Sequence, residues 1–310
     1  FSIELLRGMQ LRNEILRDKH GKWVESDYLD WGKLPTRVEA VIARRFDMLP
    51  SNCQALMIPA CVQGEIFSVE VLSHVLKITE KKVFELLNGE VCKRHRLILP
   101  LGVQKVGDAR ITLFRFRHTL FQIYLYSQLN EIEKVFQHGL IAKELEEQYK
   151  NHLAEYPQMT HSIARHFELA QLPEKAVQYF KLAGDDAMLL TAHQEAINHY
   201  YHAIDLLKGL PETSQRDQIE LGLQLSLGPP LTALKGWGPP ELEKAYDRAQ
   251  ILCESIDDST KLVPTLWLLG TFRLGRSEHT EVDRLVSRMY RLAQKTNDPA
   301  LIALANIQVS

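Results

Sequence analysis

Histidines and acidic side chains are the residues of this 310-residue sequence that could hold a metal ion or move a proton. His161 and His166 are five residues apart, so on a helix they lie on different faces. His199 and His202 share a face, but no carboxylate or cysteine completes a site there. Two ligands do not make a zinc site, so we expect no metal centre and interpret these histidines as surface or packing residues.

Motifs for nucleotide binding and for nucleophilic catalysis are missing. A phosphate-binding loop has the pattern G-x-x-x-x-G-K-[ST], because its glycines let the backbone approach the phosphates and its lysine supplies charge, and this pattern does not occur. Asp185 and Asp186 are adjacent acids, but they end a predicted helix instead of following a buried strand, so a magnesium site is not expected. No serine or cysteine has the local pattern of a nucleophile. We therefore expect that this chain alone is not an enzyme.

The bulk composition is that of an ordinary cytoplasmic protein. Hydrophobic residues make up 45% and charged residues 25%, and the net charge of -2 gives no overall field that would attract nucleic acid or a membrane. The cysteines form no C-x-x-C pair and sit in apolar helical patterns, which predicts reduced, buried thiols. They are Cys53, Cys61, Cys92 and Cys253. With no signal peptide and no apolar stretch long enough to span a bilayer, we expect a cytoplasmic location.

The segment from about 35 to 118 has the element order of a winged helix. Helical spacing predicts a helix over 36–49, and Ser51, Ser68 and Thr79 are placed to cap three more. The apolar period then changes to two, which predicts strands at 97–99 and 111–116 joined by a loop from Gly102 to Asp108. A β-hairpin at 15–24 and helices over 119–129 and up to Tyr149 complete this part of the chain.

Basic residues flank the helix that would enter a DNA groove in a DNA-binding winged helix. They are Lys81, Lys82, Lys93, Arg94, His95 and Arg96. Glu80, Glu85 and Glu90 lie among them, and few aromatic or amide side chains accompany them. We favour a solvated helix face and regard nucleic-acid binding as the alternative.

A small–aromatic–small pattern recurs after residue 157. Ala176, Phe180 and Ala183 recur as Ala196, Tyr200 and Ala203, at an offset of 20 residues, and Leu242, Tyr246 and Ala249 repeat the spacing. Positions i, i+4 and i+7 form one helix face, so two helices can approach closely with one ring between them. The pattern resembles the second helix of tetratricopeptide repeats, whose period is about 34 residues. An offset of 20 leaves room for only a short helix between Asp185 and His193.

Three stretches resemble parts of STAND-type signal-transduction ATPases, AAA-like proteins in which a winged helix and helical repeats follow the ATPase core. These stretches are the segment L-P-T-R-V-E-A-V-I-A-R-R-F-D-M-L-P at 34–50, F-R-F-R-H-T-L-F at 114–121 and T-A-L-K-G-W-G-P-P-E at 232–241. The resemblance extends over nearly the whole chain and implies that it corresponds to the part following the ATPase core. Some family members carry a class III adenylate or guanylate cyclase domain ahead of that core. Phe1 and Ser310 both lie inside helical patterns, so we expect a longer protein.

The resemblance gives His118 a specific role. In related switch ATPases, a histidine near the start of the helix after the wing contacts the β-phosphate of ADP. An imidazole can donate a hydrogen bond to phosphate, and a helix N-terminus adds a favourable dipole. Arg117 is adjacent and Thr119 could cap the helix, so His118 and Arg117 are the candidate nucleotide-sensing residues. The alternative is a structural histidine at the end of a strand.

The sequence therefore predicts a mainly α protein, a winged helix with a small β-hairpin followed by a tetratricopeptide-like α-solenoid. We expect the tail of an ATPase lid at 1–34, a winged helix at 35–118, a helical linker at 119–156 and repeats at 157–310. The implied function is to relay the binding of a protein or small molecule on the repeats to an ATP/ADP site with Mg in an upstream ATPase domain. Two alternatives stay open, a protein-interaction scaffold without switching and a DNA-binding regulator.

One aromatic residue is a candidate for partner binding. Trp237 lies in the run K-G-W-G-P-P before a predicted helix, where it could anchor a partner. It could equally fill the gap between neighbouring repeats, which is the interpretation we favour.

Overall fold

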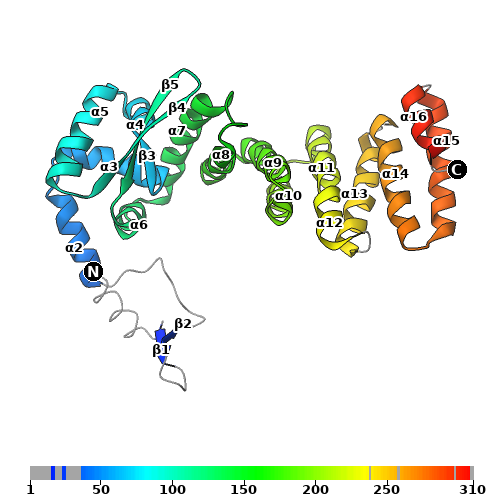
Figure 1. Cartoon of the computed structure of the whole chain (residues 1–310), viewed down its shortest axis with the longest axis horizontal. Helices are drawn as coiled ribbons and strands as arrows, with labels where there is room; N and C mark the ends of the chain where they lie inside the picture. The colour runs from blue at the N-terminus through cyan, green and yellow to red at the C-terminus, as the bar shows by residue number, and fades with distance from the viewer. Residues whose placement is uncertain are drawn as a thin grey trace. The chain divides into compact units, whose positions relative to one another are not determined.

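A computed structural model describes residues 15–17, 23–25, 36–236, 239–256, 259–296 and 298–307 (Figure 1). The chain separates into two compact units. Unit 1 comprises residues 1–152 and 169–171, and unit 2 comprises residues 153–168 and 172–310. Trp237 and most of the predicted lid segment at 1–34 lie outside the described residues.

Unit 1 combines helices with a small antiparallel sheet. Its elements are β1 (Ile15–Arg17), β2 (Trp23–Glu25), α2 (Thr36–Asp47), α3 (Ser51–Gln63), β3 (Ile66–Ser68), α4 (Val69–Leu76), α5 (Glu80–Leu86), the π-helix η1 (Leu87–Arg94), β4 (Ile98–Val106), β5 (Ala109–Phe116), α6 (Thr119–Ser127) and α7 (Glu131–Tyr149). β1 pairs antiparallel with β2, which confirms the predicted hairpin. β3, β5 and β4 form a three-stranded antiparallel sheet in that order.

Local capping explains where the short helices of unit 1 begin. The Ser68 hydroxyl accepts a hydrogen bond from the Val71 N–H, and the Thr79 hydroxyl accepts one from the Lys82 N–H, as predicted. The prediction for Ser51 was wrong, because α3 already begins at Ser51 and Pro50 occupies the N-cap position without a side-chain hydrogen bond. Proline suits this place because it has no N–H that would need a partner.

The β4–β5 hairpin is longer than the sequence predicted. A loop was expected from Gly102 to Asp108, but β4 continues to Val106 and only Gly107 and Asp108 form the turn. Gly102 has a φ of 130°, and the register shifts between Pro100 and Gly102. The glycine therefore marks a bulge inside the strand, where an extra residue is accommodated without ending the pairing. The strand β3 was not predicted.

Phenylalanine rings and two further helices complete the core of unit 1. Phe67, Phe114 and Phe116 from β3 and β5 are almost completely buried, and the Phe67 ring contacts the other two. Helices α6 and α7 both pack on α3, and α7 also packs on α4. A capping box in which Asn130 and Glu133 exchange hydrogen bonds begins α7. These two helices are therefore part of the packed unit, and α6 carries the candidate histidine at its start.

Unit 2 is helical throughout its described residues. Its elements are α8 (Pro157–Leu169), α9 (Pro173–Leu189), α10 (His193–Leu207), α11 (Ser214–Ser226), α12 (Gly228–Lys235), α13 (Pro240–Ile256), α14 (Ser259–Gly275), α15 (His279–Thr296) and α16 (Pro299–Ile307). Consecutive or near-consecutive helices pack against each other, including α9 with α10, α11 with α13, and α14 with α15. The described part of the chain is thus mainly α, as predicted, and its strands form two small antiparallel sheets.

The expected short helix between Asp185 and His193 does not exist. Helix α9 runs on to Leu189, α10 begins at His193, and three residues join them. The offset of 20 residues therefore separates the two helices of one pair, not corresponding helices of successive repeats. Thr191 has a φ of 58°, which allows the chain to reverse within this short connection.

The recurring aromatic rings lie where the pattern predicted, between closely approaching helices. Tyr200 of α10 is buried, its ring occupies the space that a side chain at Gly184 of α9 would need, and its hydroxyl donates to Asp185 Oδ1 at 2.8 Å. Tyr246 of α13 stands in the same relation to Gly228 of α12. The run Ala183–Asp186 is explained by this packing, since the glycine admits the ring and Asp185 accepts from it.

Burial of the cysteines agrees with the prediction except at one position. Cys53, Cys61 and Cys253 are buried, whereas Cys92 is half-buried. Burial raises the pKa of the Cys61 thiol to about 12, so this thiol stays protonated and unreactive. No helix among the described residues is long and apolar enough to cross a membrane.

A matched pair of glycine substitutions tests the close approach of α9 and α10. Gly184→Ala adds a Cβ that overlaps the Tyr200 ring, whereas Gly222→Ala in α11 adds one that meets no neighbour. We expect Gly184→Ala to lower the free energy of unfolding of unit 2 by about 1–2 kcal/mol, because overpacking outweighs the gain in helix propensity. Gly222→Ala should raise it by about 0.5–1 kcal/mol. Urea denaturation followed by circular dichroism measures both, and a stabilising Gly184→Ala would contradict the packing.

Candidate functional site

The candidate histidine lies at the start of α6, directly after the last strand of the sheet. His118 occupies the N-cap position with extended backbone, and its carbonyl accepts the Phe121 N–H at 2.9 Å. Thr119 was expected to cap this helix, but it is the first helical residue, one position too late for capping. His118 and Arg117 are both exposed at this strand-to-helix junction.

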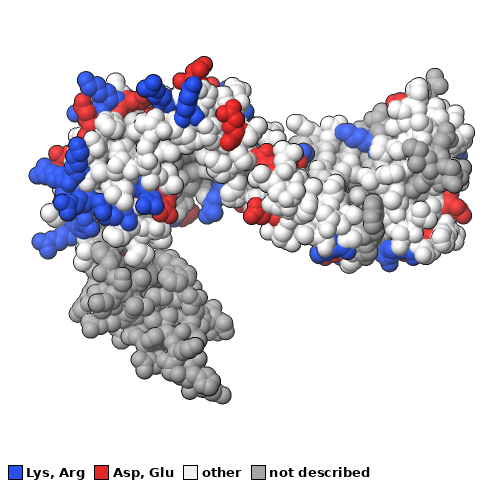
Figure 2. All heavy atoms as spheres, in the orientation of Figure 1, with Lys and Arg blue, Asp and Glu red and all other residues white. Residues whose placement is uncertain are grey.

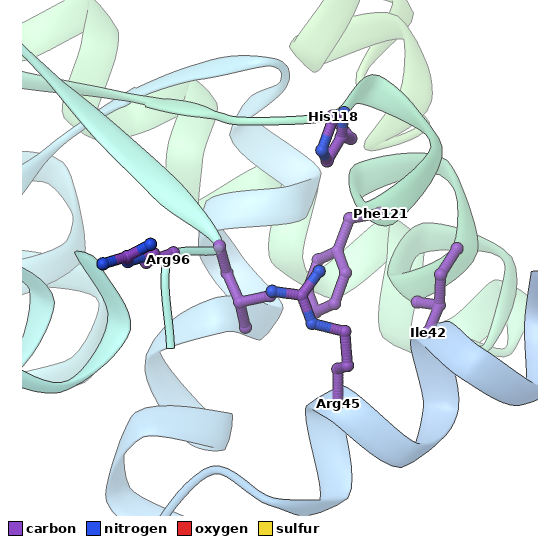
Figure 3. A pocket seen from close by; sticks show the side chains of 6 residues that line it. Ile42, Arg45, Arg96, His118 and Phe121 are labelled. Atoms are coloured by element: carbon purple, nitrogen blue, oxygen red, sulfur yellow. The ribbon is translucent and has the colours of Figure 1, made fainter. Parts of the chain in front are cut away.

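His118 borders a small pocket in unit 1. The pocket is lined by Ile42, Arg45, Arg96, Leu97, His118 and Phe121. Figure 3 shows Arg45 extending from α2 into the space in front of the Phe121 ring, with His118 at its rim, while Arg96 extends away from His118. The cavity volume is about 10 Å³, which is room for about one water molecule. Three of the six lining residues, Arg45, Arg96 and His118, carry basic side chains, whereas the surface exposed inside the pocket is mostly apolar.

The side chains of Arg45 and Arg117 hold the turn that forms one wall of this pocket. The turn includes Arg96, which has a φ of 53° and comes just after His95, the C-cap of η1. Arg45 Nη2 donates to the His95 carbonyl at 2.9 Å, and Arg117 Nε donates to the Arg96 carbonyl at 3.1 Å. The Arg117 N–H also donates to the Leu97 carbonyl. Carbonyls at a helix end need such donors, so α2, β5 and the end of η1 are held together here.

The structure brings only one of the two predicted residues to the pocket. His118 lines it, whereas Arg117 lies outside the lining and its side chain donates to the backbone. Arg45 was missed as a site residue. It follows the buried Ile42 by three residues on α2, and an arginine next to a buried apolar helix position is a signal that the guanidinium has a specific partner.

Charge is unevenly distributed along the chain. Residues 35–118 contain 13 Lys and Arg and 8 Asp and Glu, a formal charge of +5, although the whole chain carries -2. In Figure 2, Lys and Arg gather on the side of unit 1 where α2 lies, with some acidic residues among them. The overall charge used in the sequence prediction therefore concealed a basic part of the molecule.

The histidines of unit 2 are closer together than their spacing suggested. His161 of α8 and His199 of α10 have ring centroids 5.1 Å apart, and both rings contact Phe180 of α9. His202 contacts the same ring, and its Nε2 lies 2.9 Å from Glu168 Oε1. The sequence prediction had found no carboxylate for His202, because Glu168 belongs to another helix. No cluster of three or more metal-ligating side chains occurs in the part of the chain that the structure describes.

Comparisons with known proteins give weak similarity. No protein-family model matches the chain. An uncharacterised protein of Rhizobium meliloti is 24% identical over 192 residues, which are 61% of this chain and 18% of that protein. The chain thus spans about a fifth of that relative's length.

Two solved structures are similar to the chain. One is the Signal Transduction ATPase with Numerous Domains (STAND) protein with a tetratricopeptide repeat sensor from Pyrococcus horikoshii, at 12% identity and a TM-score of 0.36, over 89% of this chain and 49% of that one. The other is BtubC (BKLC) from P. vanneervenii, at 14% identity and a TM-score of 0.25, over 58% and 81% respectively. These values do not assign the chain to a family.

Substitutions of two neighbouring arginines test whether the hydrogen bond from Arg45 stabilises the turn at the pocket wall. Arg45→Met removes the donor to the His95 carbonyl, and Arg44→Met removes an exposed guanidinium from the same helix. We expect Arg45→Met to lower the free energy of unfolding of unit 1 by about 1–2 kcal/mol, because a part-buried carbonyl loses its partner. Arg44→Met should change it by less than about 0.5 kcal/mol. Chemical denaturation of the full chain measures the difference, and equal effects would rule out the proposed support of the turn.

Proposed function

We propose that this chain is the sensor and relay part of a signal-transduction ATPase that switches between ATP- and ADP-bound states. In this proposal unit 1 contacts the nucleotide held by an ATPase domain, and unit 2 receives a partner or a small molecule. Binding on unit 2 changes how unit 1 holds the nucleotide and so biases an on/off equilibrium. The observation that carries the proposal is that His118 and Arg45, two side chains that can donate to phosphate, both line one small pocket at the start of α6.

The arrangement of unit 1 supports its assignment as a winged helix. The order α3, β3, α4, α5 with η1, β4 and β5, together with the sheet order β3-β5-β4, follows that fold's sequence of helices and strands. A winged helix reads DNA in many proteins, but the fold alone does not define what it binds. We propose that here its strand-to-helix junction faces a phosphate group.

The size of the pocket limits what it can do. A cavity of about 10 Å³ cannot enclose a nucleotide, so we propose that His118 and Arg45 contact one side of a phosphate that another domain holds. A guanidinium and an imidazole are suitable donors to phosphate oxygens, and the N-terminus of α6 adds a favourable dipole. ATP or ADP with Mg would supply this phosphate, and ATP hydrolysis itself is assigned to the ATPase domain.

The first functional test removes the imidazole in the intact protein. We expect His118→Ala to raise the Kd for ADP about tenfold, which corresponds to the loss of one charge-assisted hydrogen bond, and to raise the basal ATPase rate. Isothermal titration calorimetry and a phosphate-release assay measure these two quantities. His279→Ala, which removes an exposed histidine from α15, is the matched control and should leave both unchanged. Unchanged ADP affinity and basal rate in His118→Ala would remove the hypothesis.

The formal charge of +5 on residues 35–118 supports the alternative function, which is DNA binding. Against it, the Arg94 guanidinium is already engaged by Glu90 at 3.1 Å, so part of the charge on η1 is neutralised locally. A mobility-shift assay with duplex DNA at two salt concentrations separates the two functions. The relay account expects no retardation at moderate salt, whereas a salt-dependent shift that Lys93→Gln and Arg94→Gln abolish would establish the DNA-binding function.

A further inference from the structure

Unit 2 contains a groove of about 530 Å³ between its first three helices. This volume lies in the range of small-molecule and side-chain binding sites. The lining comes from the first half of α8, the last turns of α9 and the first half of α10, and includes Asp186, Ala187, Glu195, Asn198, His161 and His199. Three helices of one unit thus shape a cavity whose polar side chains face a common space.

Two imidazole rings line one side of this groove. They belong to His161 and His199, and their centroids are 5.1 Å apart. Phe180, which is buried and does not line the groove, supports both rings at 5.9 Å and 6.1 Å, and His202 contacts Phe180 at 4.5 Å. Faces of neutral aromatic and imidazole rings attract a planar cation, and a guanidinium group can stack on them.

The charges around the rings are predominantly negative. Asp186 and Glu195 line the groove, and Asp186 Oδ2 is oriented by the Thr160 hydroxyl at 2.7 Å. Glu168 approaches from α8, and Arg165 is the opposing cation beside His161. The C-terminal end of α9 and the N-terminal end of α10 both border the groove, so the partial charges of the two helix dipoles oppose each other there. The charged side chains therefore determine the sign of the electrostatic potential in the groove. Residues 153–310 as a whole carry 20 Asp and Glu and 15 Lys and Arg, a formal charge of -5.

We propose that this groove binds an arginine side chain of a basic peptide segment in a partner, and that protonation of His161 and His199 releases it. The carboxylates of Asp186 and Glu195 attract the guanidinium, and the rings provide a surface on which it stacks. This proposal rests on the proposed function only in taking unit 2 as the region that receives the signal. It concerns peptide binding and not nucleotide switching.

The two histidines give this binding its pH dependence. Partial burial, followed by the charge of Arg165, lowers the pKa of His161, and partial burial together with His161 lowers the pKa of His199. Glu168 and Glu195 oppose these effects without reversing them. Both imidazoles are therefore mostly neutral at neutral pH and become protonated at a lower pH than an ordinary histidine. Once protonated, they add positive charge within the groove, where it repels a guanidinium.

The test measures fluorescence anisotropy of the full chain with a labelled Gly-Ser peptide containing two arginines. An otherwise identical peptide with citrulline in both places removes the charge and keeps the shape. At about pH 7.5 we expect the arginine peptide alone to bind. As the pH is lowered stepwise, its affinity should fall roughly tenfold once both histidines are protonated, since two nearby cations then oppose it. Replacing both histidines, as His161→Asn with His199→Asn, should abolish most of this pH dependence.

Two glutamate-to-glutamine substitutions distinguish binding in the groove from a nonspecific attraction of the peptide to the acidic surface of unit 2. Glu195→Gln removes a carboxylate that lines the groove, and Glu174→Gln removes one from the first turn of α9 outside it. We expect Glu195→Gln to weaken the arginine peptide roughly two- to fivefold, as for a partly exposed ion pair, and Glu174→Gln to have no effect. Circular dichroism confirms that the variants fold.

Three outcomes would overturn the inference. These are equal binding of the citrulline peptide, equal effects of the two glutamate substitutions, and no binding of the arginine peptide at any pH. Peptide binding that leaves ADP affinity unchanged in the intact protein would support the groove and contradict the relay, so the two proposals fail separately.

Discussion

The need to satisfy backbone carbonyls at the end of η1 is the constraint on which the candidate site depends. Arg96 has a left-handed backbone there, and the carbonyls of His95 and Arg96 are held by Arg45 and Arg117. Because Arg45 comes from α2 and Arg117 from the end of β5, the turn connects three segments that are distant in sequence. The place of His118 beside Arg45 is a consequence of this connection, since His118 directly follows Arg117.

A second constraint, the close approach of helices, shapes unit 2. Tyr200 reaches Asp185 only because Gly184 has no side chain, and the buried contact brings α10 close to α9. The same approach places His199 and His202 against Phe180 and near His161. Helix packing thus brings histidines of α8 and α10 together around the Phe180 ring. The groove results from this packing, and no sequence motif marks it.

Local patterns predicted much of this fold, and long-range contacts account for what they missed. Capping by Ser68 and Thr79, the β1–β2 hairpin and the small–aromatic–small faces depend on neighbouring residues, and the structure confirms them. The three-residue strand β3 has no such signal, because it exists only by pairing with β5. The role of Arg45 and the gathering of histidines around Phe180 likewise depend on segments that tertiary packing brings together. The bulge at Gly102 was mistaken for a loop because glycine favours both.

The central claim is that the junction carrying His118 contacts a nucleotide phosphate held by another domain. A structure of the intact protein with bound ADP and Mg tests it most directly. The account predicts a His118 ring nitrogen within about 3.2 Å of a phosphate oxygen, with the Arg45 guanidinium on the same side of the phosphate. A phosphate group contacted only by other segments, with His118 facing solvent, would contradict the account.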